Sequence, residues 1–347
     1  MDDYPGFDWL RIVLASGVFW VHAGSVEHFN FAGDFFVQVF FALSGFLIGG
    51  IILRMKPTDL PRFFYNRTIR IWLPFLAAVA ILYLTAYLKE GFAPYFWHSL
   101  AFDLTFTHNY FIAKAPEVIA QLPINGTGSH FWSIAVEEQF YLLAPILILF
   151  VPLAKYWATW VLIAIVATVL GTFYGSVSAG VLGAMLNRRF GNWHLHPLAI
   201  ALFICVAIMV SGLWALDIFE YRYMIPIFAI VTVLLCARPG QRTAFGKWIG
   251  GISFPMYLNH WIGLFVAAAI ASRLPNLGVL TADIFGFALS IAVAALAYRL
   301  IDRNLYTYRS SWYAPALGIT AVMAAYTLMA LGLIFGLYAI GPLTGPA

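Results

Sequence analysis

The stretch HFWSIAVEEQFYLLAPILILF, residues 130–150, has the length and apolar character of a membrane-spanning helix, yet it contains two adjacent carboxylates. A helix crosses the hydrocarbon core of a bilayer with about 20 mostly apolar residues. A charged side chain near the centre of such a helix costs roughly 3 kcal/mol to insert, and one that occurs there is by default a functional hypothesis. Glu137 and Glu138 therefore mark this stretch both as a transmembrane helix and as a candidate site.

The composition of the whole chain agrees with a membrane protein. Apolar residues make up 63% of the sequence and charged residues 10%, whereas soluble domains have about 45–50% and roughly 25%. The sequence predicts an all-α, polytopic membrane helical bundle. The net charge of +4 then reflects topology and gives no support for a nucleic-acid partner. Cys205 and Cys236 both lie in apolar runs, so we expect no disulfide framework.

Hydropathy predicts a series of helices of which about ten or eleven cross the bilayer, the sixth being short for a full crossing. They cover residues 9–27, 33–53, 71–88, 131–151, 156–175, 176–187, 196–216, 223–237, 248–271, 277–299 and 313–340. The intervening segment 89–130 is strongly aromatic, which predicts helices or re-entrant pieces at the membrane interface. We expect a single membrane domain over residues 1–347.

The distribution of basic residues predicts the orientation. With the N-terminus in the cytoplasm, most Lys and Arg residues lie at cytoplasmic ends and loops, as the positive-inside rule requires. The outer side then holds only Lys89, Lys114, Arg222 and Arg273. The N-terminal MDDYPGFDW is acidic, unlike the start of a signal peptide, so we expect the first span to be retained.

The stretch that holds the two carboxylates has one polar face. His130, Ser133, Glu137 and Tyr141 follow each other at intervals of three or four residues, so they share one side of a helix, and Glu138 points about a quarter-turn away. For Ser133 and Tyr141, a hydrogen-bond network between helices explains the pattern as well as a direct role does. For Glu137 we favour function, because an amide would make the same bonds at lower cost.

The first span places an imidazole at the same depth. Arg11 and His22 are eleven residues apart, which puts them on nearly the same face and roughly 16 Å apart along the axis. Arg11 is then cytoplasmic, and His22 lies past the middle of the membrane, level with Glu137. A carboxylate that orients a histidine is typical of a general base. Taken alone, His22 could equally be a structural core histidine.

A basic loop follows the second span. Arg67 and Arg70 in FFYNRTIRIWLPF are three residues apart and share a helical face at the cytoplasmic surface. Positive charge there marks topology in most membrane proteins. Paired arginines also grip phosphate groups bidentately, so both interpretations stay open.

Further polar residues lie inside other spans. Asp34 and Gln38 are near the outer end of the second span, and Gly45 deeper in that helix predicts close packing against a neighbour. Asn259 and His260 lie about half-way along GGISFPMYLNHWIG, and this polar pair needs partners.

Six of these stretches, in this order, resemble the acyltransferase-3 family of integral-membrane acyltransferases. They are DWLRIVLASGVFWVHAG, FFVQVFFALSGFLI, NRTIRI, HFWSIAVEEQFYLLAP, GISFPMYLNHWI and YRLIDRNLY. The resemblance covers roughly residues 6–310 and leaves 313–340 as an additional C-terminal span. Asn259 stands where the family commonly has tryptophan, and Asp302 and Asn304 replace its usual glutamate and proline. The extra periplasmic hydrolase-like domain of some members is not in this sequence, so we expect function to lie in the membrane part.

The resemblance implies transfer of an acyl group, most often acetyl, from cytoplasmic acyl-CoA to a hydroxyl of a cell-envelope glycan or glycolipid, in a bacterial inner membrane. Neither a permanently bound cofactor nor a metal is expected. Applied to these residues, it gives a catalytic set of His22, Glu137 and Ser133 and a CoA-binding set of Arg11, Arg67 and Arg70. Substrate contacts are expected from Asp34, Gln38, His130, Tyr141, Asn259 and His260, and Glu138 is expected to anchor a neighbouring helix.

One rival function is a proton-coupled transporter or flippase of an envelope precursor, since intramembrane His and Glu residues also serve transport. Transporters more often contain two related halves with broken helices, and this sequence shows none. Direct acyl transfer and an acyl-histidine intermediate at His22 both fit the pattern.

Overall fold

The structure, a computed structural model, describes residues 3–24, 33–111 and 121–339. Its ordered elements are helices, with no strand among the described residues. Each predicted span coincides with a helix. These are α1 (Pro5–Ala23), α2 (Phe35–Ile52), α4 (Leu73–Glu90), α9 (Trp132–Phe150), α10 (Trp157–Val169), α11 (Tyr174–Phe190), α12 (Pro197–Ala215), α13 (Tyr221–Cys236), α14 (Ala244–Arg273), α15 (Val279–Ala297) and α17 (Pro315–Ala339).

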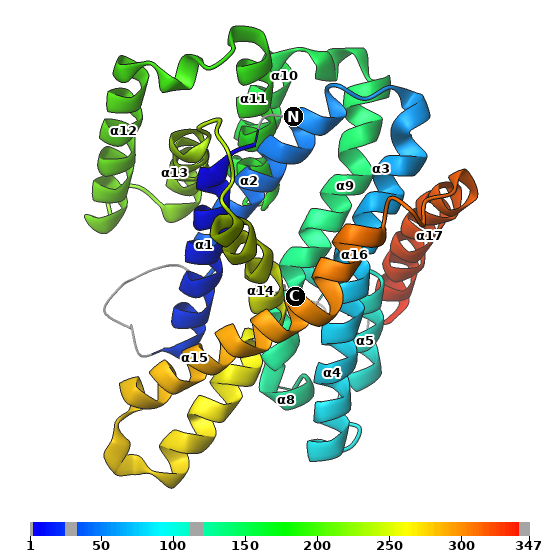
Figure 1. Cartoon of the computed structure of the whole chain (residues 1–347), viewed down its shortest axis with the longest axis vertical. Helices are drawn as coiled ribbons and strands as arrows, with labels where there is room; N and C mark the ends of the chain where they lie inside the picture. The colour runs from blue at the N-terminus through cyan, green and yellow to red at the C-terminus, as the bar shows by residue number, and fades with distance from the viewer. Residues whose placement is uncertain (1–2, 25–32, 112–120, 340–347) are drawn as a thin grey trace. The chain divides into compact units, whose positions relative to one another are not determined.

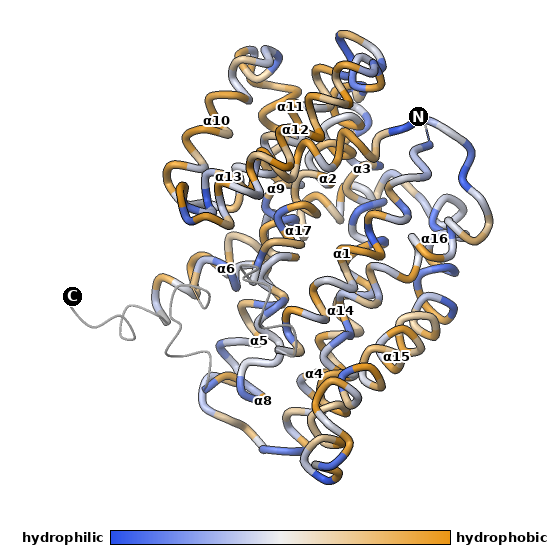
Figure 2. The backbone as a smooth tube through the Cα atoms, turned by 90° about the vertical axis from the view of Figure 1, so that its left-hand side faces the viewer, coloured by the Kyte–Doolittle hydropathy of each residue, from blue (hydrophilic) through white to orange (hydrophobic). Residues whose placement is uncertain are grey.

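The all-α membrane fold is confirmed. Seven helical stretches in the described chain are long and apolar enough to cross a bilayer, and α10 and α13 are shorter apolar helices. Helix α12 has a mean hydropathy of 2.5 with only 11% of its most apolar window buried, and Figure 2 shows its tube mostly in the hydrophobic colour. Apolar side chains that face outward in this way fit a lipid environment. The number of crossings and their orientation stay predictions.

The aromatic segment after α4 forms short helices where it is described. They are α5 (Phe96–Leu104), α6 (His108–Phe111), α8 (Pro123–Gly126) and the 3₁₀ turn η3 (Thr127–Phe131). The prediction of helices is therefore confirmed for these parts, and their position at an interface stays a prediction. Residues 112–120, which include Lys114, lie outside the described residues, as do residues 25–27 and 340 at the ends of two predicted spans.

Local sequence sets the ends of the helices that matter most below. Pro5 begins α1, where its missing N–H is no loss. Gly24 ends α1 with φ of 73°, a left-handed conformation that favours glycine. Thr243 caps α14, because its hydroxyl accepts the Gly246 N–H at 2.9 Å.

The chain forms two compact units. Unit 1 comprises Met1–Met55 and Ala144–Tyr298. In it α14 and α15 form a long hairpin, α1 packs along α14, and α2 packs along α11 (Figure 1). The predicted close packing at Gly45 is confirmed: a Cβ there would collide with the carbonyl oxygen of Val177, and one at Gly180 would collide with that of Ala42. Small residues thus let the α2 and α11 backbones touch.

Unit 2 comprises Lys56–Leu143 and Arg299–Ala347. Here α3 (Leu60–Arg67) runs through a π-helical segment, η2 (Thr68–Trp72), into α4. Helix α17 packs against α3 and α5, and α16 (Arg303–Tyr308) contacts η2. Helix α9 belongs to unit 2 as far as Leu143.

Candidate functional site

The packing of α1 against α14 brings two histidines of unit 1 together. Ala15 and Phe19 of α1 pack with Ile252 and Met256 of α14 in a buried cluster. This contact continues to the last turn of α1, where His22 lies. The result is a pairing of α1 with the middle of α14 that no local sequence signal indicates.

His22 and His260 are hydrogen-bonded and stacked. Their Nδ1 and Nε2 atoms are 2.9 Å apart, and their rings lie nearly parallel at 8° with centroids 5.0 Å apart. His260 is 2% exposed, and its Nδ1 lies 2.7 Å from the carbonyl oxygen of Tyr257. His22 is exposed, with its second ring nitrogen facing away from that bond. The prediction that His260 needs a partner is confirmed, and His22 is one such partner.

At the other end of α1, Arg11 belongs to a charge cluster. Asp8 is 1% exposed and is held by Arg242 through two bonds of 2.6 Å. Arg11 lies 3.7 Å from the same carboxylate. Two guanidinium groups thus lie around one buried carboxylate at the start of α1. The role of Arg11 toward CoA stays a prediction.

The two polar residues predicted in the second span are bonded to each other. The Gln38 amide donates to Asp34 at 2.7 Å and accepts from the Ser176 hydroxyl at 2.6 Å. Gln38 is 6% exposed and Ser176 is fully buried. The amide oxygen thus joins α2 to α11, and the amide nitrogen bonds the residue that caps α2. A substrate role for Asp34 and Gln38 stays a prediction beside this structural one.

Asn259 lies beside His260 on α14 and is 7% exposed. Its side-chain nitrogen donates to the Pro255 carbonyl at 3.0 Å, and its Oδ1 has no hydrogen-bond partner among the described residues. A buried amide oxygen without a partner is costly in a folded protein. This atom is therefore suited to a substrate donor rather than to the negative oxygen of a reaction intermediate.

The polar face predicted on α9 is present in unit 2. The Tyr141 hydroxyl donates to Glu137 at 3.0 Å, one helical turn away. His130 and Ser133 are 4% and 3% exposed. His130 Nδ1 lies 3.0 Å from the Thr127 carbonyl, and the Ser133 hydroxyl points back to the His130 carbonyl at 3.4 Å. The bond confirms that Glu137 and Tyr141 share a face, His130 lies in η3 just before α9, and the catalytic and substrate roles of these residues stay predictions.

Glu138 anchors a neighbouring helix, as the sequence predicts. It is 4% exposed and accepts the Trp72 indole N–H at 3.0 Å, from the π-helical segment η2. Its second oxygen has no partner among the described residues. The two adjacent carboxylates therefore have different surroundings, since Glu137 is bonded along α9 and Glu138 across to η2.

Arg67 directly precedes that same π-helical turn and Arg70 lies within it, and such turns occur frequently at functional sites. Arg67 lies over the rings of Phe63 and Tyr141, 5.7 and 5.6 Å from their centroids. Arg70 is exposed, and both are within electrostatic reach of Arg309. Burial lowers the pKa of Arg309, and nearby Arg70 adds to this effect while Tyr306 opposes it. Three arginines thus concentrate positive charge in unit 2.

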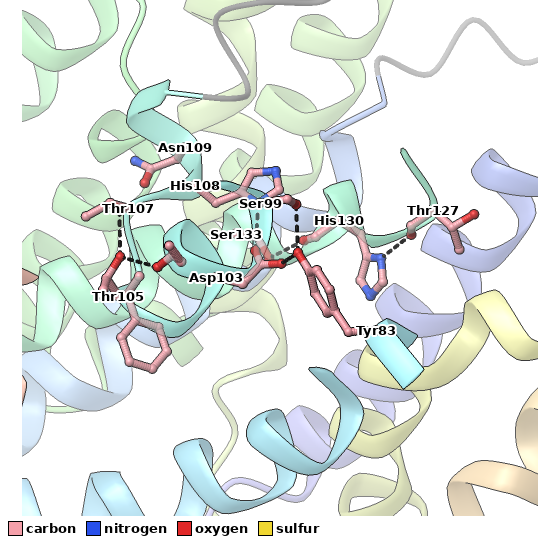
Figure 3. Close-up of polar contacts among 12 residues, drawn as sticks. Tyr83, Ser99, Asp103, Thr105, Thr107, His108, Asn109, Thr127, His130 and Ser133 are labelled. Atoms are coloured by element: carbon pink, nitrogen blue, oxygen red, sulfur yellow. Dashed lines mark hydrogen bonds and ion pairs between the residues drawn. The ribbon is translucent and has the colours of Figure 1, made fainter. Parts of the chain in front are cut away.

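Sequence analysis missed a buried network in the segment FDLTFTHNY, residues 102–110. The Asp103 carboxylate bonds His108 Nδ1 and the Tyr83 hydroxyl, both at 2.6 Å, and Tyr83 and Ser99 are 2.7 Å apart (Figure 3). All four residues are at most 5% exposed. The sequence signal for this network was a carboxylate and a histidine within a strongly aromatic segment. Isolated polar groups in such surroundings need hydrogen-bond partners.

The predicted pairing of His22 with Glu137 stays a prediction. His22 belongs to unit 1 and Glu137 to unit 2. Within their own units, each already has a short bond, to His260 and to Tyr141 respectively.

Comparison with known proteins connects these residues to a family. Residues 4–299 match the acyltransferase-3 family, described as an acyltransferase domain. The chain belongs to this family. Over 153 residues, this chain is 29% identical to O-acetyltransferase OatA of Staphylococcus aureus. The matched stretch makes up 42% of this chain and 25% of that protein.

A second relative is a putative O-acetyltransferase of Staphylococcus aureus strain COL. It is 28% identical over 153 residues, which is 42% of this chain and 24% of that protein. The matched stretch therefore spans about a quarter of the length of each of these two curated relatives. No solved structure matches this chain.

Proposed function

We propose that this chain is a membrane-bound O-acyltransferase that moves an acyl group, most simply acetyl, from cytoplasmic acyl-CoA to a hydroxyl of a cell-envelope glycan on the outer side of a bacterial inner membrane. Membership of the acyltransferase family and relatives named as O-acetyltransferases support the reaction class. The observation that carries the proposal is the exposed imidazole of His22, held against His260.

The reaction needs a base that removes a proton from a weakly acidic hydroxyl. His22 Nε2 takes the proton while the hydroxyl oxygen attacks the thioester carbonyl carbon. The carbon–sulfur bond then breaks, and the CoA sulfur takes up the proton that His22 holds. One C–O bond replaces one C–S bond, and the imidazole returns to its starting state.

The position of His22 on its helix favours this cycle. It lies in the last turn of α1, where the helix dipole stabilises a positive charge by about 0.3–1 kcal/mol or more when partly buried. The imidazolium formed during transfer is therefore stabilised by the backbone of α1. The same dipole would disfavour an anion at that place.

Charge supports a phosphate-bearing donor. Arg67, Arg70 and Arg309 lie within electrostatic reach of one another, and Arg11 shares Asp8 with Arg242. CoA carries phosphate groups, which guanidinium groups bind in a bidentate manner. We assign these arginines to the donor. The aromatic segment 89–130 suits the acceptor, because aromatic faces stack on sugar rings.

The test measures thiol release from acetyl-CoA by the purified, detergent-solubilised protein with and without a glycan acceptor. Wild type is expected to release thiol only when acceptor is present, and His22→Gln is expected to lose the activity. A transporter or flippase would release none. Mass spectrometry of envelope glycans from cells with and without the protein identifies the acceptor, and unchanged acylation there would contradict the proposal.

A further inference from the structure

We propose that Arg67 and Glu138 together bind one secondary amide, with the Arg67 Nε–H donating to the amide carbonyl oxygen and Glu138 Oε1 accepting the amide N–H. Within the proposed function, on which this assignment rests, the amide belongs to the pantetheine arm of acyl-CoA. Glu138 thereby has a role in donor binding beside its structural bond to Trp72. All the residues concerned lie in unit 2.

Two contacts between η2 and α9 bring these side chains into one region. The Trp72 indole N–H donates to Glu138 Oε2 at 3.0 Å, and the Arg67 guanidinium lies over the Tyr141 ring, 5.6 Å from its centroid. Arg67 and Trp72 are about one turn apart on the π-helical segment. Glu138 and Tyr141 are likewise about one turn apart on α9. The two contacts therefore lie one above the other, with Arg67 and Glu138 within electrostatic reach of each other.

Each of these two side chains has a buried polar atom that bonds none of the described residues. The atoms are Arg67 Nε, which is a donor, and Glu138 Oε1, which is an acceptor. The rings of Phe63 and Tyr141 attract the charge of Arg67 but give its N–H groups no oxygen acceptor. Leaving buried polar atoms without partners is costly, and native proteins rarely do so. One ligand that accepts from Arg67 and donates to Glu138 satisfies both atoms.

A secondary amide matches this pair of atoms. In a trans amide the C=O and the N–H point in opposite directions, so the group fits between a donor and an acceptor that do not bond each other. An ionised carboxylate offers only acceptors, so it has no donor for Glu138, and an ammonium group offers only donors, so it has no acceptor for Arg67. A hydroxyl or a water both donates and accepts, and the ligands compared below separate these cases from an amide.

The amide has two possible sources, which are the pantetheine arm of CoA and the N-acetyl group of a sugar in a glycan acceptor. Charge favours CoA. Arg70 is exposed on η2, and Arg309 is within electrostatic reach of both Arg67 and Arg70. Guanidinium groups bind phosphate bidentately, and the pantetheine arm is attached directly to the phosphates of CoA. Phosphates at Arg70 therefore bring the arm to the half-buried Arg67.

Calorimetry of the purified, detergent-solubilised protein tests this with CoA and with adenosine 3′,5′-bisphosphate, which has phosphates but no pantetheine arm. Glu138→Gln keeps an acceptor for Trp72 and replaces Oε1 with an NH₂ donor. We expect it to weaken CoA binding at least about 10-fold, the worth of one hydrogen bond to a charged group. The bisphosphate is expected to bind no more weakly, because removing a negative charge by itself favours anions.

Two arginine variants complete the comparison. Arg67→Lys keeps the charge but loses the Nε–H, so it is expected to weaken binding of CoA more than that of the bisphosphate. This variant also decides the question if Glu138→Gln does not fold. Arg70→Ala is expected to weaken both ligands, since it acts on phosphate. The matched control is Asp59→Asn, which removes a negative charge from an exposed residue of unit 2 that accepts the Lys56 N–H at 2.9 Å. It is expected to leave the ratio of the two affinities unchanged.

Unchanged CoA affinity in Glu138→Gln, or an equal loss for both ligands, would overturn the inference, and so would a CoA-selective loss in Asp59→Asn. Weaker binding of N-acetylglucosamine with unchanged CoA binding would assign the amide to the acceptor and overturn its assignment to CoA. A CoA-selective loss in Glu138→Gln without any thiol release by wild type would support the amide site and overturn only the proposed reaction.

Discussion

The buried network around Asp103 makes a quantitative prediction about stability. Its carboxylate accepts one bond from His108 and one from Tyr83, both at 2.6 Å and both at sites at most 5% exposed. Asp103→Ala leaves the buried His108 N–H without its acceptor, while the Tyr83 hydroxyl still lies 2.7 Å from the Ser99 hydroxyl. An unsatisfied buried group costs about 1–3 kcal/mol, so the substitution is expected to cost at least about 1–3 kcal/mol. Tyr83→Phe removes one donor and is expected to cost about 1–3 kcal/mol.

The assay is unfolding of the detergent-solubilised protein, followed by circular dichroism. Asp59→Ala is the matched control, since Asp59 is an exposed residue of unit 2 that accepts only the Lys56 N–H at 2.9 Å, and its loss is expected to cost about 1 kcal/mol or less. The double variant of Tyr83 and Asp103 should cost less than the sum of the single changes, with a coupling of about 0.5–3 kcal/mol. Additive costs, or an Asp103→Ala effect no larger than that of Asp59→Ala, would refute the network.

Three further predictions concern the remaining polar residues. Glu137→Gln is expected to lower turnover with little change in CoA affinity, measured by thiol release and calorimetry, and unchanged turnover would remove it from the catalytic set. Glu138→Gln keeps an acceptor for Trp72, so it should lower the melting temperature less than Glu138→Ala does, and equal shifts would contradict the bond. Arg67→Ala and Arg70→Ala should weaken CoA binding in a salt-dependent manner with only partial rescue by lysine, whereas full rescue would indicate topology marking alone.

The fold was predictable because the bilayer imposes one dominant rule on the sequence. Each crossing must satisfy its backbone internally and present about 20 mostly apolar residues. Helix α12, with its high mean hydropathy, follows directly from that rule. The aromatic segment 89–130 was harder, since its helices are short, as in α6 (His108–Phe111), and carry no clear period.

Side-chain partners were predictable only within one helix. The Tyr141–Glu137 bond follows from a spacing of four residues. The bond of Trp72 to Glu138 joins residues 66 positions apart, so the sequence indicated that Glu138 has an anchor but not which residue it is. The Asp103 network escaped prediction for a related reason, because Tyr83 reaches it from the preceding helix.

The partner of His22 shows why membrane depth alone is too weak a criterion for choosing the residue that orients a histidine. Glu137 and His260 were both placed near mid-membrane from sequence, so depth could not decide between them. The structure adds a contact within unit 1 that depth did not indicate: Ala15 and Phe19 of α1 pack on α14, and this contact carries His22 to within 2.9 Å of His260. The pairing of His22 with Glu137 stays a prediction. Helix contacts in a membrane depend on shape and small residues spread over the chain. A base assigned from sequence therefore needs its helix neighbours before its orienting residue can be named.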